Sequence, residues 1–200
     1  MRLVGYYASP FARRVGITLH LYGMPFDHDP LDTGNLAALE PLSPLGRVPA
    51  LVLDDGSVMT DSSAIIDHLD ELAGDRALTP RSGPARRQVM ALTALALATA
   101  EKYVASYYET HRRPATHIWH PWLDRLNLQI RQGLSALEAQ LDGPYLTGAT
   151  LTQADVTAIA ALDGIRLDMP DLAPPADFPK LYELRDRTAA LDAFRLTPPE

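Results

Sequence analysis

The chain changes its pattern of secondary structure near residue 75. Before that point, short apolar segments typical of strands alternate with segments whose apolar residues recur at helical spacing. After it, every segment has helical spacing, and neither a strand pattern nor an internal repeat occurs. We therefore expect two domains: a small mixed α/β domain over residues 1–75 and an all-helical domain over residues 85–200. A Pro- and Gly-containing linker over residues 76–84 joins them.

The first domain is expected to run strand–helix–strand and then strand–strand–helix. Pro10 opens the first helix and Gly23 closes it, while Asp61 or Ser62 caps the second helix. Asp55-Gly56 between two apolar runs indicates a hairpin, and a strand–helix–strand unit implies a parallel strand pair. A further irregular helical turn is expected within residues 34–42. The expected strands cover residues 2–7, 26–29, 50–53 and 57–60.

The second domain is expected to contain four helices. Thr152 and Asp155 have the spacing of a capping box at the start of the third of these helices, where they would serve folding and not catalysis. The helices are expected over residues 85–111, 121–141, 153–167 and 178–191.

Charge and composition exclude several classes of function. The chain has 18 basic and 25 acidic residues, a formal net charge of −7, which argues against a nucleic-acid partner. It has no cysteine, so disulfides, cysteine-ligated metals and cysteine nucleophiles are excluded. Three histidines between residues 111 and 120 lack metal-ligand spacing, so we expect no metal. We expect that the first residues do not form a signal peptide and that the apolar run over residues 89–100 is too short and too rich in Thr and Ala to span a bilayer. We therefore expect a cytoplasmic protein with no membrane partner.

The order of elements matches a thioredoxin-like half, and four motifs then resemble the glutathione transferase superfamily. Together with the helical second half, the resemblance covers essentially the whole chain. It implies a thioredoxin-like N-terminal domain, an all-α C-terminal domain and glutathione as co-substrate. The motifs are S-P-F-A-R-R-V at residues 9–15, P-L-G-R-V-P-A at 44–50, Asp61-Ser62, and T-Q-A-D at 152–155.

Ser9 is the residue that the resemblance to serine-type transferases assigns to the glutathione thiol. It lies between a strand and a helix N-terminus, where a hydroxyl and unpaired N–H groups can stabilise a thiolate. The alternative is that Ser9 only caps the helix. Tyr7 is the competing thiol partner, because other transferase classes use a tyrosine there and residues two apart on a strand share a face. The G-x-S-x-G elbow of serine hydrolases is absent.

The resemblance also implies a set of glutathione-binding residues. The Val48-Pro49 bond would be cis, and the Val48 backbone would pair with the glutathione peptide like an added strand. Asp61 would bind the γ-glutamyl ammonium and Ser62 the neighbouring carboxylate, although either residue alone would also serve as a helix cap. Arg47 would reach the glycyl carboxylate or remain a solvated surface charge. The implied set is Phe11, Arg47, Val48, Pro49, Asp61 and Ser62.

Tyr103, Tyr107 and His111 share one helix face at steps of four, and the resemblance makes them candidates for the pocket of an electrophilic substrate. The alternative is that these side chains pack in the core or at the domain interface. The implied activity is conjugation of the glutathione thiolate to a small electrophile, in detoxification, by a homodimer. The lack of cysteine argues against family members that reduce disulfides. The alternative function is a glutathione-binding or structural interaction module without catalysis.

Overall fold

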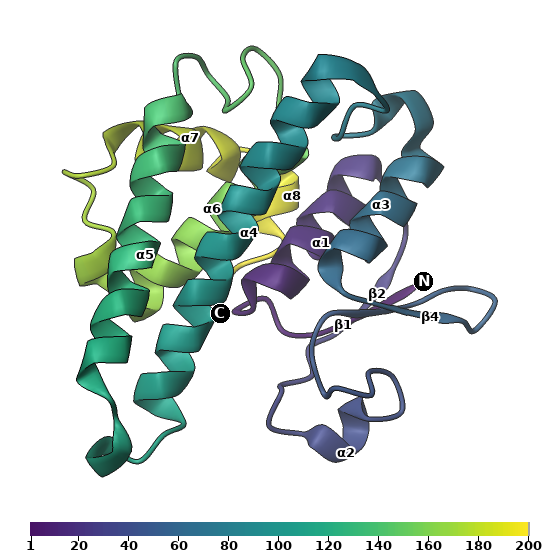
Figure 1. Cartoon of the computed structure of the whole chain (residues 1–200). Helices are drawn as coiled ribbons and strands as arrows, with labels where there is room; N and C mark the ends of the chain where they lie inside the picture. Colours follow the sequence, from purple (N-terminus) through teal and green to yellow (C-terminus); the bar gives the residue numbers. More distant parts are fainter. Residues whose placement is uncertain (200) are drawn as a thin grey trace. The chain divides into compact units, whose positions relative to one another are not determined.

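A computed structural model of the chain describes residues 1–199, which form two compact units (Figure 1). One unit comprises Met1–Arg81 together with the residues from Thr188 onward, and the other comprises Ser82–Arg187. The first unit contains a four-stranded sheet with helices, and the second is built from helices. The expected pairing of a mixed α/β domain with a helical domain is confirmed.

The sheet of the first unit has the strand order β2-β1-β3-β4. β1 and β2 are parallel, and β3 and β4 form an antiparallel hairpin, as the sequence predicted. β3 also pairs antiparallel with β1, which the sequence did not predict. The hairpin turns at Asp55-Gly56, where Asp55 Oδ1 accepts a hydrogen bond from Ser57 N at 2.9 Å. The strands are β1 (Arg2–Val4), β2 (Asp27–Asp29), β3 (Ala50–Val52) and β4 (Val58–Thr60).

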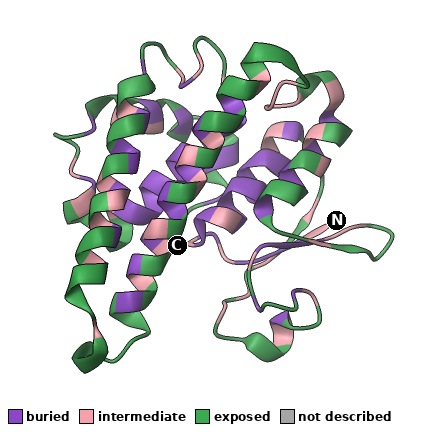
Figure 2. Cartoon of the chain, in the orientation of Figure 1, coloured by how far each residue is buried: buried purple, intermediate pink, exposed green. Residues whose placement is uncertain are grey.

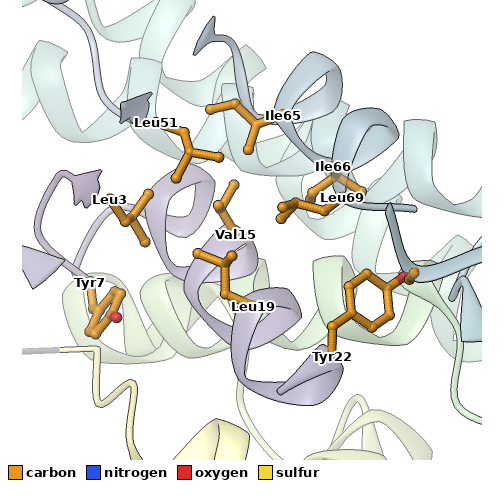
Figure 3. Close-up of a cluster of buried hydrophobic side chains, with 10 residues drawn as sticks. Leu3, Tyr7, Val15, Leu19, Tyr22, Leu51, Ile65, Ile66 and Leu69 are labelled. Carbon is orange, nitrogen blue, oxygen red and sulfur yellow. The ribbon is translucent and has the colours of Figure 1, made fainter. Parts of the chain in front are cut away.

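Side chains alternate along each strand, so each strand contributes side chains to both faces of the sheet. Helices of the first unit pack against both of these faces. Leu3 and Leu51 face α1 and α3 and form a core with Val15, Leu19, Ile65 and Leu69 (Figure 3). Their neighbours Val4 and Ala50 face the other way and pack with Leu39 of α2. The helices are α1 (Pro10–Tyr22), α2 (Leu36–Leu39), α3 (Ser62–Ala73), which runs on into the 3-10 turn Gly74–Arg76, and α8 (Asp192–Arg195).

The second unit is organised around α4, which packs against both α5 and α6. α6 begins with the predicted capping box, in which Asp155 Oδ2 accepts from Thr152 N at 2.7 Å and from Thr152 Oγ1 at 2.8 Å. The elements are α4 (Gly83–His111), a 3-10 turn (Ala115–His117), α5 (His120–Gln140), α6 (Gln153–Asp168), a 3-10 turn (Pro170–Leu172) and α7 (Pro179–Ala189).

α4 is long and apolar enough, by length and composition alone, to cross a membrane. The helix extends over 29 residues, beyond the apolar run over residues 89–100 on which the expectation was based. A core helix passes the same test, and α4 buries a stripe of side chains at helical spacing (Figure 2). That stripe includes Val89, Leu92, Ala96, Ala100 and Tyr103.

The division of the chain differs from the expected domain limits at two places. α4 starts at Gly83, inside the expected linker, because Pro84 is compatible with a first helical turn. The residues from Thr188 onward join the first unit, although their helical pattern placed them in the second. α8 packs against α1, and Arg13 Nε donates to Thr197 O at 2.7 Å. Helical spacing reports local structure, and it does not report the element against which a helix packs.

Candidate functional site

Ser9 is the N-cap of α1, at the junction of the loop after β1 with the helix. Its Oγ accepts a long hydrogen bond, 3.4 Å, from Ala12 N, and Pro10 occupies the first helical position. The long distance makes this a weak cap, so the hydroxyl remains available as a donor to a ligand. An anion beside Ser9 would also meet the positive end of the helix dipole.

Tyr7 lies away from that helix terminus and against the body of α1. Its ring stacks on His28 with centroids 3.9 Å apart. A Cβ atom added at Gly16 would lie 2.6 Å from Tyr7 Cε1, so the ring contacts the helix backbone directly. Burial raises the pKa of Tyr7 to about 12. β1 ends at Val4, so the two-residue alternation that was expected to bring Tyr7 and Ser9 onto one strand face does not apply.

Asp61 and Ser62 form the N-terminus of α3. Asp61 is exposed, and its Oδ1 caps the helix by accepting from Ser63 N at 2.8 Å. Its φ of 70° places a non-glycine residue in the left-handed region, a costly conformation that concentrates at functional positions. Ser62 is buried as the first residue of the helix. The pair therefore presents a carboxylate and a hydroxyl side by side at a positive helix end.

Arg14 connects α1 to the N-terminus of α3 and was not identified from the sequence. It lies on α1, five residues beyond Ser9, and its Nη1 donates to Ser62 Oγ at 3.1 Å. The side chain is 1% exposed, and burial lowers the pKa of Arg14 to about 10, while Asp61 and Asp70 oppose that shift. The available signal was a charged residue inside the apolar spacing of a helix, because such a residue is buried only with partners.

The remaining predicted glutathione-binding residues lie at the start of β3 and the start of α1. The Val48-Pro49 peptide bond is cis, as expected. Val48 is partly buried and approaches Gly5, since a Cβ at Gly5 would lie 2.8 Å from Val48 Cβ. Arg47 is exposed, and its backbone N–H donates to Ser43 Oγ at 3.2 Å. Phe11 is partly exposed in the first turn of α1.

Three aromatic rings follow one another along α4, as their spacing predicted. Tyr107 stands edge-on to Tyr103 with centroids 6.5 Å apart and stacks on His111 at 4.1 Å. Their surroundings differ. Tyr103 is buried, lies over Gly164 and donates its hydroxyl to Asp168 Oδ2 at 2.5 Å, whereas Tyr107 is partly exposed and His111 is exposed. Tyr103 thus contributes to packing within the second unit, and the other two present ring surface to solvent.

Within residues 1–199, no group of three His, Asp or Glu side chains is placed to hold a metal ion. The candidate site of the first unit brings together the hydroxyls of Ser9 and Ser62, the carboxylate of Asp61, the buried guanidinium of Arg14 and two helix N-termini. Such groups suit a ligand that carries both anionic and cationic ends.

Comparison with known proteins identifies the family. A model of the glutathione S-transferase N-terminal domain matches residues 3–77, and a model of the C-terminal domain of the same proteins matches residues 121–187. The GST-like protein YibF of Escherichia coli (strain K12) is 31% identical over 100% of this chain and 98% of its own length. Maleylacetoacetate isomerase of Pseudomonas aeruginosa is 29% identical over 100% of this chain and 96% of its own length.

A solved structure agrees over the full length of the chain. It is that of a glutathione transferase family member from Pseudomonas fluorescens Pf-5 with bound glutathione, which has 31% sequence identity and a TM-score of 0.90. The alignment covers 100% of this chain and 98% of that one. Both domain models, the full-length relatives and the two-unit fold lead to one conclusion: the chain belongs to the glutathione S-transferase superfamily.

Proposed function

We propose that this protein binds glutathione at its α/β unit and is a glutathione-dependent enzyme that adds the thiolate to a small electrophile. The observation that carries the proposal is the pair of helix N-termini, one with Ser9 and one with Asp61-Ser62, where Ser62 accepts a hydrogen bond from the buried Arg14 of α1. Glutathione has a thiol to activate and a zwitterionic γ-glutamyl end to recognise, and the two termini match these needs. The bound glutathione of the P. fluorescens relative supports the assignment.

In the proposed binding mode, Asp61 accepts from the γ-glutamyl ammonium, and Ser62 donates to the adjacent carboxylate. The backbone of Val48 pairs with the peptide of glutathione, while Arg47 approaches the glycyl carboxylate. Phe11 and Pro49 complete the surface around the ligand. The exposed Asp61 and Arg47 leave both ends of the tripeptide partly solvated.

Ser9 is the proposed activator of the thiol. Its hydroxyl donates to the sulfur, and together with the dipole of α1 it lowers the pKa of the thiol, whose proton passes to solvent. The thiolate lone pair then forms a carbon–sulfur bond with the electrophile. In a substitution, the leaving group departs with its bonding electrons; in an addition, the resulting carbanion takes a proton from water. We propose Tyr107 and His111, with Tyr103 supporting them, as part of the surface that receives the electrophile.

Isomerisation is the second candidate reaction, because the full-length match to maleylacetoacetate isomerase favours it. The same thiolate would add reversibly to an activated cis double bond. Rotation about the new single bond and expulsion of the thiolate would then give the trans product, so glutathione is not consumed. Both reactions use one activated thiol and differ in the fate of the adduct.

The test combines binding with two turnover measurements on the purified protein. Glutathione titration calorimetry measures binding, chlorodinitrobenzene reports conjugation with release of chloride, and NMR follows cis-to-trans conversion of an activated alkene at constant glutathione. Binding with conjugation supports a transferase, and binding with isomerisation supports an isomerase. Binding with neither reaction supports the non-catalytic binding module. Absence of binding at millimolar glutathione overturns the proposal.

We further propose that the protein is a cytoplasmic homodimer whose reaction detoxifies electrophiles. Light scattering coupled to size exclusion measures the oligomeric state against the monomer mass of 21.9 kDa. A monomer at working concentration would contradict the homodimer and leave the site chemistry unaffected.

A further inference from the structure

Arg14 is a buried cation placed where electrostatics disfavours one. Its guanidinium is 1% exposed and lies against the first residue of α3, to which it donates through Nη1 at 3.1 Å. The N-terminus of a helix already has positive potential, so a second positive charge beside it is unfavourable without a nearby anion. The exposed Asp61 and the partly buried Asp70 raise the pKa of Arg14 and so stabilise its charge. A ligand carboxylate at the end of α3 would stabilise it further.

The direction of the Arg14–Ser62 hydrogen bond determines what Ser62 can do. A guanidinium has donors only, so Ser62 Oγ must be the acceptor in this pair. The hydroxyl proton of Ser62 then points elsewhere, and no residue in the part of the chain that the structure describes accepts it. Ser62 is buried, so a ligand acceptor is the natural partner for this proton.

The surroundings of Ser62 match a carboxylate and not a neutral group. The hydroxyl proton and the N–H groups of the first turn of α3 are all donors, and the charge of Arg14 lies behind them. Asp61 stands beside these donors with its carboxylate in solvent. An α-amino acid end, with its ammonium next to its carboxylate, is complementary to this arrangement.

We propose that Arg14 is a positioning residue for the γ-glutamyl carboxylate of glutathione: it orients the Ser62 hydroxyl as a donor and supplies positive potential from beneath the α3 terminus. This inference rests on the proposed function, since it names glutathione as the ligand. In this binding mode Arg14 does not touch the ligand and acts through Ser62.

Arg13 offers a matched control. It is the neighbouring residue on α1, is equally buried at 3% exposed, and donates through Nε to Thr197 O, away from Ser62. Replacement of either arginine removes a buried guanidinium, so both variants should lose stability. Only the Arg14 variants should change recognition of the ligand carboxylate.

The experiment compares glutathione with 4-aminobutyryl-cysteinylglycine, which keeps the ammonium and lacks the γ-glutamyl carboxylate. Calorimetry gives the affinity ratio of the two ligands for the wild type, Arg14→Met, Arg14→Lys, Ser62→Ala and Arg13→Met. We expect the wild type to prefer glutathione by about tenfold to hundredfold, the range for hydrogen bonds to a charged group. Arg14→Met and Ser62→Ala should bring the ratio toward one, Arg14→Lys should retain part of it, and Arg13→Met should leave it unchanged.

A wild-type ratio in Arg14→Met or Arg14→Lys, with glutathione still bound, overturns the role of Arg14 and leaves the proposed function standing. Failure of the wild type to bind glutathione overturns both. If the Arg14 variants do not fold, Ser62→Ala tests the proposal. An unchanged affinity ratio of the two ligands in Ser62→Ala would show that the hydroxyl does not donate to the carboxylate, and this would also overturn the positioning role of Arg14.

Discussion

Replacement of Ser9 by alanine separates activation of the thiol from capping of the helix. The substitution removes the hydroxyl that we propose as donor to sulfur, and it also removes the bond from Ala12 N. That bond is 3.4 Å long, so its loss should lower the free energy of unfolding by about 0.5–1 kcal/mol, the lower part of the range for N-caps. The protein should therefore remain folded.

The effect on the thiol should be larger. A hydrogen bond to a charged group contributes about 1.5–3 kcal/mol, and one pKa unit corresponds to about 1.4 kcal/mol. The pKa of bound glutathione should therefore rise by about 1–2 units in Ser9→Ala. Below the thiol pKa, kcat/KM should fall by about tenfold to hundredfold, and the loss should shrink at higher pH as solvent deprotonates the thiol.

The assay titrates the ultraviolet absorbance of the bound thiolate and records kcat/KM against pH. Ser9→Thr keeps a hydroxyl and should restore most of the wild-type pKa. Tyr7→Phe is the competing variant: the ring of Tyr7 packs on Gly16 and His28, and burial raises its pKa to about 12, so removal of its hydroxyl should leave the thiol pKa unchanged. If Tyr7→Phe raises the thiol pKa while Ser9→Ala does not, the assignment of Ser9 is refuted.

Three further substitutions test other parts of the structure. Asp61→Asn keeps the cap and tolerates the positive φ but removes a charge that stabilises the buried Arg14, so the melting temperature should fall slightly. Glutathione affinity measured by calorimetry should fall about tenfold, and unchanged affinity would contradict the ammonium contact. Asp155→Ala removes the acceptor of three hydrogen bonds of 2.7, 2.7 and 2.8 Å at the start of α6, so the free energy of unfolding measured in urea should fall by about 2–4 kcal/mol. A fall of less than about 1 kcal/mol would show that these bonds add little to stability. Gly133→Ala would place a Cβ 2.0 Å from Thr99 Oγ1 and should destabilise by about 1–3 kcal/mol, with recovery in the double variant with Thr99→Ala; no recovery would locate the strain elsewhere.

The sequence predicted the features that depend on residues close together in the chain. The cap at Ser9, the hairpin at Asp55-Gly56 and the capping box at Thr152 and Asp155 each involve groups within three positions of one another. Their chemistry is complete in a short window, so the residue types alone determine them. The parallel strand pair followed in the same way from the order of elements.

Features that depend on contacts between distant segments were not predictable in this way. Arg14 meets Ser62 across 48 positions, and Arg13 meets Thr197 across 184. The two arginines are adjacent and chemically identical, so only the fold distinguishes a residue beside the candidate site from one that holds the C-terminal segment. Tyr103 and Tyr107 differ likewise: helical spacing gives them one face, and burial separates the packed ring from the accessible one.

A chain with a formal net charge of −7 is expected to repel an anionic tripeptide such as glutathione. The arrangement of groups around α1 and α3 offsets this repulsion at the proposed site. Long-range repulsion from surface carboxylates is screened within about 8 Å at physiological ionic strength. Groups in direct contact with a ligand are screened far less, and in the proposed binding mode they are two helix N-termini, one of which is backed by a guanidinium that is 1% exposed. Because Arg14 is buried, its charge raises the potential at the end of α3 and contributes little to the charge on the protein surface. The potential at the proposed site and the net charge of the chain are thus set by different residues. The net negative charge, which argued against a nucleic-acid partner, is therefore no argument against glutathione as a ligand.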